Sequence, residues 1–259
     1  MHTSKFFASL LVLLALVLGA APARAKTVNC TAITTLPAII TVQGVYCFTG
    51  NLAFVEPFAD AIDIQTNNVV LDLNGFTLSG LAAGLGTGAS GIRASDRQNI
   101  TIKNGTIRGF RRGILLVDPG GASQGHVVED IRADQNTQVG IEVDGSGHIV
   151  RNNQVVGTGG TTLGGGNASA TGIFVFGTGP RVLNNDVIHT FAPGFGIARG
   201  IFFTLATGGL AVNNRITEAA SGIEYQGSSS STGKYRDNLT FGVPTATRFV
   251  GGTAVGTND

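Results

Sequence analysis

Short apolar runs separated by Gly and Asn recur along most of the chain. The dipeptide Gly-Ile opens such a run at residues 91, 113, 140, 172, 200 and 222, at intervals of 22, 27, 32, 28 and 22 residues. Within one run, Ile100-Thr101-Ile102-Lys103 alternates apolar and polar side chains, as a half-buried strand does. Runs of this length, broken by Gly and Asn, are too short for helices. The pattern therefore predicts a stack of short β-strands.

A second motif, centred on Asn, recurs with the same repeat as Gly-Ile. It occurs as Lys103-Asn104-Gly105, Arg151-Asn152-Asn153, Leu183-Asn184-Asn185, Val212-Asn213-Asn214 and Arg236-Asp237-Asn238. Asn tolerates left-handed backbone geometry and can hydrogen-bond its equivalent one coil away, so it suits the corners of a solenoid. Leucine-rich repeats have a similar length, but the chain lacks their leucine ladder. We therefore predict an all-β parallel β-helix of about seven coils, roughly 35 Å long at about 4.8 Å per coil.

The two ends of the chain do not follow the repeat. The N-terminus has a positive start, an apolar stretch of about a dozen residues and the small-x-small site Ala23-Arg24-Ala25, all typical of a secretory signal. That stretch is shorter than the roughly 20 residues that cross a bilayer, and we predict no transmembrane segment after signal removal. The predicted protein is secreted or periplasmic, with a signal peptide at 1–25, an N-terminal cap at 26–60, the parallel β-helix at 61–241 and a C-terminal cap or tail at 242–259.

The net charge argues against a nucleic-acid partner, and the cysteines predict a disulfide. Without Lys5 and Arg24 of the signal, 17 − 2 = 15 basic residues face 16 acidic ones, a net charge of −1. Because a near-neutral chain has no global field that gathers polyanions, no nucleic-acid partner is expected. The only cysteines are Cys30 and Cys47. Two cysteines in an exported chain, ahead of the repeats, predict one structural disulfide in the cap.

The repeats resemble a known family. Val69 to Gly80, Asn99 to Ile114 and the Asn-Asn phrases are similar to the bacterial right-handed parallel β-helix repeat family of pectate-lyase-like fold, over roughly residues 61–240. The ends of the chain resemble exported members without an assigned activity. The family includes polysaccharide lyases, epimerases, hydrolases and adhesins, so the resemblance implies a right-handed solenoid and favours carbohydrate without selecting a reaction.

Aligning the strands that follow Gly-Ile predicts a candidate binding surface. If Ile points inward, one outward row reads Arg93, Leu115, Glu142, Phe174, Phe202 and Glu224, and the next reads Ser95, Val117, Asp144, Phe176, Thr204 and Gln226. Acids thus flank three aromatic rings, an arrangement that can grip sugar hydroxyls or a hard cation. The candidate surface comprises Arg93, Glu142, Asp144, Phe174, Phe176, Phe202 and Glu224. Alternatively, insertions at 157–171 and 190–199 fold over the phenylalanines and bury them.

Two histidines form a weaker candidate. His126 and His148 lie in similar local sequences 22 residues apart, one coil, so one is expected above the other. A stacked pair could bind a metal or transfer a proton near neutral pH. Two ligands alone make no zinc site, so no metal site is predicted. In the alternative, the histidines only mark a turn.

Three functions remain open at this point. The leading hypothesis is an exported β-helix that binds extracellular or cell-surface polysaccharide. The alternatives are a polysaccharide lyase or epimerase for uronate polymers, and a structural or adhesive rod. For a lyase, the resemblance implies an Arg or Lys base beside acids that hold calcium or the substrate carboxylate; otherwise no cofactor is expected. Asp118-Pro119 is followed by Gly120-Gly121 and not by the His-Asp of mannuronan epimerases, and no catalytic residue is assigned.

Overall fold

The computed structural model of the 259-residue chain describes residues 27, 29–165, 167–226 and 232–259. The predicted signal peptide at 1–25 therefore lies outside the described residues. Among those that are described, no helix is long and apolar enough to cross a membrane.

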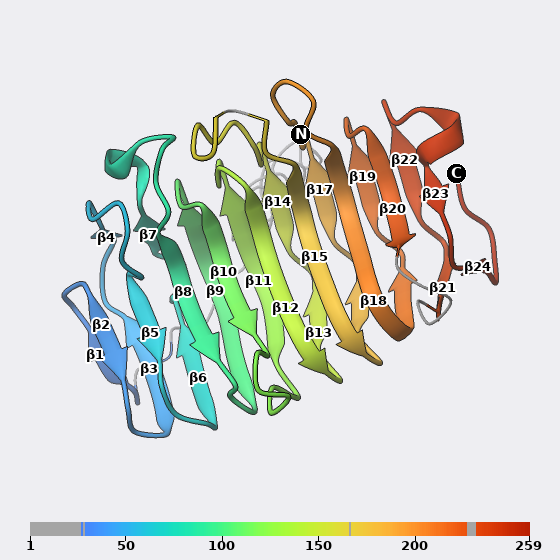
Figure 1. Ribbon diagram of the computed structural model, residues 1–259. Helices are drawn as coiled ribbons and strands as arrows, with labels where there is room; N and C mark the ends of the chain where they lie inside the picture. The colour runs from blue at the N-terminus through green and yellow to red at the C-terminus, as the bar shows by residue number, and fades with distance from the viewer. Residues whose placement is uncertain (1–26, 28, 166, 227–231) are drawn as a thin grey trace, which may run out of the picture.

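The described strands wind into a solenoid with three faces, and the strands of each face pair in parallel (Figure 1). Sheet 1 comprises β2 (Ala38–Ile40), β5 (Ile62–Ile64), β8 (Ser90–Ser95), β10 (Arg112–Val117), β12 (Val139–Ser146), β15 (Ala170–Thr178), the first part of β18 (Ala198–Val212), β20 (Ser221–Gln226) and β23 (Phe249–Val250). Sheet 2 comprises β1 (Thr31–Ile33), β3 (Gly44–Phe48), β6 (Val69–Asp72), the first parts of β9 (Ile100–Arg108) and β11 (Val127–Asp134), β13 (Ile149–Arg151), β16 (Arg181–Leu183), the end of β18, β21 (Thr232–Arg236) and β24 (Thr253–Ala254). Sheet 3 comprises β4 (Leu52–Ala53), β7 (Thr77–Ser79), the ends of β9 and β11, β14 (Gln154–Val156), β17 (Asp186–Ile188), β19 (Arg215–Thr217) and β22 (Leu239–Phe241). Two short 3-10 turns, η1 (Leu81–Ala83) and η2 (Thr245–Thr247), complete the described elements.

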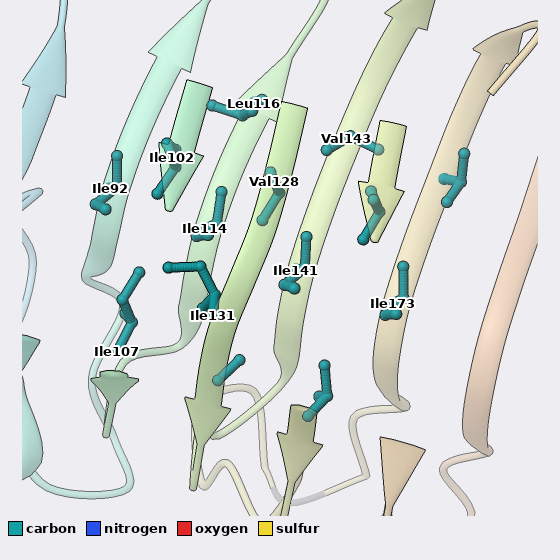
Figure 2. Packing of buried hydrophobic residues seen from close by; sticks show 14 of the residues in the cluster. Ile92, Ile102, Ile107, Ile114, Leu116, Val128, Ile131, Ile141, Val143 and Ile173 are labelled. Carbon is teal, nitrogen blue, oxygen red and sulfur yellow. The ribbon is translucent and has the colours of Figure 1, made fainter. Parts of the chain in front are cut away.

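The Gly-Ile repeat forms the inner row of sheet 1. Ile92, Ile114, Ile141 and Ile173 are fully buried and lie one above another along the solenoid (Figure 2). Each isoleucine therefore contributes the same position of the core in successive coils, which confirms the predicted stack.

The Asn phrase serves two purposes at the corner between sheets 2 and 3. Its first residue takes left-handed geometry at the surface, with φ of 56°, 57° and 53° at Asn152, Asn184 and Asn213. Its second residue points inward and builds a buried ladder. In that ladder, Asn153 donates to Asn185 at 3.0 Å, and the contact repeats through the coils at Asn214, Asn238 and Asn258. Both properties expected of corner Asn are present, on neighbouring residues.

The stack extends beyond the coils that the repeat marks. β5, β8, β10, β12, β15, β18 and β20 are the sheet-1 strands of the seven coils predicted within 61–241. Parallel pairing continues into the predicted cap, where β2, β3 and β4 pair with β5, β6 and β7, and into the tail through β23 and β24. The predicted disulfide is confirmed, since Cys47 in β3 is bonded to Cys30, just ahead of β1.

The insertions project from the edge between sheets 3 and 1, together with the loop that contains η1 (Figure 1). Thr162 of the first insertion donates its backbone N–H to the carbonyl of Leu85 at 3.1 Å. The two insertions are also joined to each other, since Ile197 donates to Ser169 Oγ at 3.1 Å. These loops therefore brace one another along one edge of the solenoid.

Candidate functional site

The structure places the predicted outward rows of sheet 1 in the predicted register. Glu142 pairs with Phe174, and Phe174 pairs with Phe202. Along the next row, Asp144 pairs with Phe176. The resulting acid–aromatic surface consists of Glu142, Asp144, Phe174, Phe176, Phe202 and Glu224.

The three rings of this surface differ in accessibility. Phe176 is 36% exposed and Phe174 is half-buried, whereas Phe202 is only 8% exposed. Phe174 and Phe202 meet edge to face, with centroids 5.5 Å apart, and the guanidinium of Arg199 lies 4.4 Å from the Phe202 centroid. The outcome lies between the two sequence alternatives, because Phe202 is covered and Phe176 remains open.

Two of the acids are held by arginines that lie outside the predicted surface. Arg112 Nε donates to Glu142 Oε2 at 2.7 Å, and Arg199 Nε donates to Glu224 Oε2 at 2.9 Å. In each pair the arginine directly precedes a Gly-Ile dipeptide and the glutamate belongs to the next coil. That shared position was a signal that could have revealed both pairs. Glu142 and Glu224 are thus engaged in ion pairs within the sheet.

Asp144 is the acid of this surface that lacks such a partner. Its side chain is half-buried, and its buried Oδ1 has no hydrogen-bond partner within the described part of the chain. Burial, and then the charges of Glu142 and Asp118, raise the pKa of Asp144 to about 7, against the opposing effect of Arg112. A carboxyl group with this pKa can donate or accept a proton at neutral pH.

Arg93 lies apart from the rest of the predicted surface. Leu115 separates it from Glu142 in the row, and Arg93 faces Asp60 and Asp63 instead, at 3.8 Å from each. The structure therefore brings six of the seven predicted residues together and leaves Arg93 outside the cluster.

The two histidines are stacked but buried. The rings of His126 and His148 lie 4.7 Å apart and nearly parallel. The Nδ1 atom of each accepts a backbone N–H, from Ile100 and from His126 respectively, both at 3.1 Å. In the neutral rings Nε2 must then carry the proton, which His126 donates to Ser123 Oγ at 2.8 Å.

This geometry favours a structural role for the pair. Burial lowers the pKa of His126 to about 3, and it also lowers that of His148. Because Nε2 of His126 is protonated, the ring cannot take a proton from Ser123. No group of three or more His, Cys, Asp and Glu in the described residues could hold a metal ion. The histidines thus act as a short ladder between coils, as the asparagines do at another corner.

Comparison with known proteins is consistent with this architecture. A family model described as the right-handed β-helix region matches residues 25–172, more than half of the chain. No curated protein matches the sequence. Among solved structures, the chain is similar to the Agl-KA catalytic domain, with 17% identity and a TM-score of 0.54 over 79% of this chain and 38% of that one.

Weaker similarity extends to two other structures. Pectate lyase Pel9A is 11% identical with a TM-score of 0.41, covering 80% of this chain and 70% of that one. The A-module of the mannuronan C-5 epimerase AlgE4 from Azotobacter vinelandii is 11% identical with a TM-score of 0.36, covering 80% and 83%. The chain spans about two fifths of the Agl-KA domain, and that likeness concerns the fold alone. Together, the family match and the parallel three-faced solenoid establish that the chain belongs to the right-handed β-helix family.

Proposed function

We propose that the chain is exported and binds an extracellular or cell-surface polysaccharide along sheet 1, on the acid–aromatic surface. The observation that carries the proposal is the exposed ring of Phe176, with Phe174 beside it and the carboxyl of Asp144 one coil away in the same row. A sugar ring has apolar faces and a rim of hydroxyls. Its face packs on an aromatic ring, while a carboxyl group exchanges hydrogen bonds with its hydroxyls. Export is supported by the Cys30–Cys47 disulfide, which is typical of oxidising compartments.

The spacing of the solenoid also suits a polymer. Coils lie about 4.8 Å apart, close to the length of one sugar unit along an extended chain. A polysaccharide that lies along the solenoid axis therefore meets a new row position at about every unit. Glu142 and Glu224 at either end are fixed by their arginines, and Glu224 is only 8% exposed, so these pairs frame the surface while Phe176, Phe174 and Asp144 face the polymer.

The binding proposal is tested by affinity electrophoresis of the mature protein in gels that contain alginate, pectate, hyaluronan or a neutral glucan. We expect retardation by at least one polymer, and about tenfold weaker binding for Phe176→Ala, because the exposed ring loses its apolar contact. Phe241→Ala is the matched control, since Phe241 is 75% exposed but lies in sheet 3. Equal retardation of both variants would favour a rod that adheres through another surface.

A second candidate function, catalysis on uronate polymers, is favoured by Asp144. With a pKa of about 7, Asp144 is partly ionised at neutral pH and can accept the proton from the carbon beside a uronate carboxylate, which converts Asp144 to its acid form. Lyases and epimerases share that first step. The described residues contain no cluster of three or more His, Cys, Asp and Glu that could hold a metal ion, and no step is assigned to calcium.

The catalytic candidate has its own test. The protein is incubated with alginate, pectate and hyaluronan, with and without calcium, and the ultraviolet absorbance of unsaturated products is followed. Epimerisation is read by NMR of the polymer. Activity should be lost in Asp144→Asn, which keeps the shape of the side chain but cannot ionise. Absence of both products rejects the lyase and epimerase but leaves the binding proposal in place.

A further inference from the structure

A cavity of about 420 Å³ lies at the edge between sheets 3 and 1, outside the acid–aromatic surface. Its walls come from segments that are far apart in the sequence. Leu81 and Leu85 of the η1 loop form one wall, and His189 and Phe191 form the other. Gln135 and Thr137 contribute to the floor between them. We call this feature the corner cavity.

The corner cavity exists because glycine occupies the turn after several sheet-3 strands. Gly109 and Gly157 hold equivalent left-handed positions, with φ of 75° and 62°, after β9 and β14. These two positions add no side chain to the floor, whereas the equivalent positions after β11 and β17 carry Gln135 and His189. Thr162 fixes the opposite wall through its hydrogen bond to Leu85. The volume falls within the roughly 300–1,000 Å³ typical of small-ligand sites.

The walls of the cavity are apolar yet accessible to solvent. Leu85 is 56% exposed, and Leu81 and Phe191 are also exposed. The Phe191 ring leans on the imidazole of His189, with centroids 5.2 Å apart. Gathered apolar side chains that face water around a concave space favour an apolar ligand.

One polar group of the lining, the imidazole of His189, can orient a ligand in the cavity. Nδ1 of His189 lies 3.0 Å from Glu218 Oε2. An ionised carboxylate only accepts, so Nδ1 carries the proton in the neutral ring and Nε2 is left as an acceptor. On the floor, Thr137 is only 2% exposed and its Oγ1 is covered, so it shapes the cavity without presenting a hydroxyl to a ligand. The cavity therefore offers one hydrogen-bond acceptor, in the wall formed by His189.

From this combination we propose that the corner cavity binds a small neutral aromatic ring that bears a hydroxyl group, a ligand of the phenol class. The ring packs between the leucines and Phe191, and its hydroxyl donates to Nε2 of His189. No lining residue carries a carboxylate, an ammonium or a guanidinium, so nothing in the lining selects a charged ligand. A sugar ring fits less well, because its many hydroxyls would face leucines and lose their hydrogen bonds to water. The proposal is independent of polysaccharide binding on sheet 1.

The test is a fluorescence titration with 2-naphthol, whose emission shifts on entering an apolar site. The chain has no Trp, so protein emission interferes little. We expect saturable binding that phenol displaces. Phe191→Ala and, on the exposed loop, Leu85→Asp should each weaken it at least fivefold. Phe241→Ala and Phe176→Ala should leave it unchanged, which separates this site from the surface of sheet 1.

The proposed hydrogen bond from the ligand hydroxyl to His189 Nε2 is tested by comparing 2-naphthol with naphthalene, which lacks the hydroxyl, in the wild type and in a His189 variant. His189→Asn removes Nε2 and tolerates the left-handed backbone, where φ is 56°. The wild-type protein should prefer 2-naphthol over naphthalene about tenfold, and His189→Asn should abolish that preference. Unsaturable binding, or variants of the walls that bind as well as the wild type, would overturn the proposal. Displacement of 2-naphthol by a methyl glycoside at the same concentration as phenol would overturn the choice of ligand.

Discussion

Glycine occupies the same position in the six successive coils from Gly91 to Gly222, because the backbone of the next coil takes the space of its side chain. A Cβ atom on Gly113 would lie 2.6 Å from the carbonyl oxygen of Gly140, and one on Gly140 would lie 2.7 Å from that of Gly172. The obstacle is backbone that is already hydrogen-bonded, so it cannot move aside cheaply. The Gly-Ile repeat is thus a steric requirement as well as a pattern of burial.

Gly140→Ala should therefore destabilise the protein. Its new methyl group would also meet Val155 Cγ1 at 2.5 Å, and we expect a loss of about 3 kcal/mol in the free energy of unfolding, as for overpacked cores. Gly50→Ala is the control, because a Cβ there has no atom within 4 Å. Denaturant titration measures both, and similar stabilities for the two variants would contradict the steric argument.

The raised pKa of Asp144 links stability to pH. The pKa in the folded chain is about 7, against an ordinary value of 3.8. Well below pH 3.8 the group is neutral in both states and has no effect. As pH rises from about 4 to 7, the unfolded chain ionises first, so stability is lost across this window and stays lost above it.

Asp144→Asn should remove this penalty. We expect the variant to be more stable than the wild type at pH 8, by about 2 kcal/mol after allowance for partial solvent screening. At pH 3.5 the difference should nearly disappear. Denaturant titrations at the two values provide the measurement, and an equal gain at both would show that the effect does not come from ionisation.

At the scale of elements, the asparagine ladder adds side-chain hydrogen bonds between successive coils at a corner, where the backbone pairing of sheets 2 and 3 is interrupted. Asn185 donates to Asn214 Oδ1 and accepts from both Asn153 Nδ2 and the Asn153 backbone N–H, all at 3.0 Å. The bonds lie in the interior, where an unsatisfied polar group costs most.

Asn185→Leu should break the ladder and leave its neighbours unsatisfied. We expect a loss of about 3 kcal/mol in the free energy of unfolding, since more than one buried group loses its partner. Asn184→Gly supplies the comparison, because Asn184 is exposed and has a left-handed φ of 57° that glycine adopts freely. Thermal and denaturant unfolding should show little change in that variant. A mild effect of Asn185→Leu would mean that water replaces the side chain.

The features that could be predicted from the sequence are those set by a motif that repeats once per coil. The pairing of Glu142 with Phe174 was predictable because the Gly-Ile dipeptide fixes the register of each strand. The exposure of the phenylalanines was not predictable, since the register of the strands does not say which of Phe174, Phe176 and Phe202 a neighbouring side chain such as Arg199 will cover.

Irregular segments explain the remaining differences. The coil that contains β2, β3 and β4 lacks the Gly-Ile and Asn phrases, yet a strand needs only a suitable alternation of inward side chains. The corner cavity depends on the contact of Leu85 with Thr162, between loops 77 residues apart and without periodicity. Such contacts leave no local signal in the sequence.

At the scale of the whole molecule, each coil contacts mainly the coils before and after it. A stack of this kind is stabilised by the sum of its interfaces, and local opening begins where one interface is missing. The first and last coils of the described stack are reinforced differently. Cys30 and Cys47 bond covalently beside β1 and β3, whereas stacked aromatic rings fill the last coils, with Phe203 and Tyr225 only 4.3 Å apart.

The disulfide should therefore protect one end of the solenoid more than its middle. In the loop-entropy model, a link across 17 residues contributes about 3 kcal/mol. Because coupling passes from coil to coil, loss of the bond should raise the opening of β1 to β4 most, then of β5 to β7, and leave β15 to β18 nearly unchanged. Hydrogen exchange of the Cys30→Ser, Cys47→Ser variant, followed by mass spectrometry, measures this gradient peptide by peptide. The oxidised and the reduced wild type give the matched pair without substitution. A uniform increase along all coils would show instead that the solenoid opens as one cooperative unit, with the disulfide acting on the whole of it.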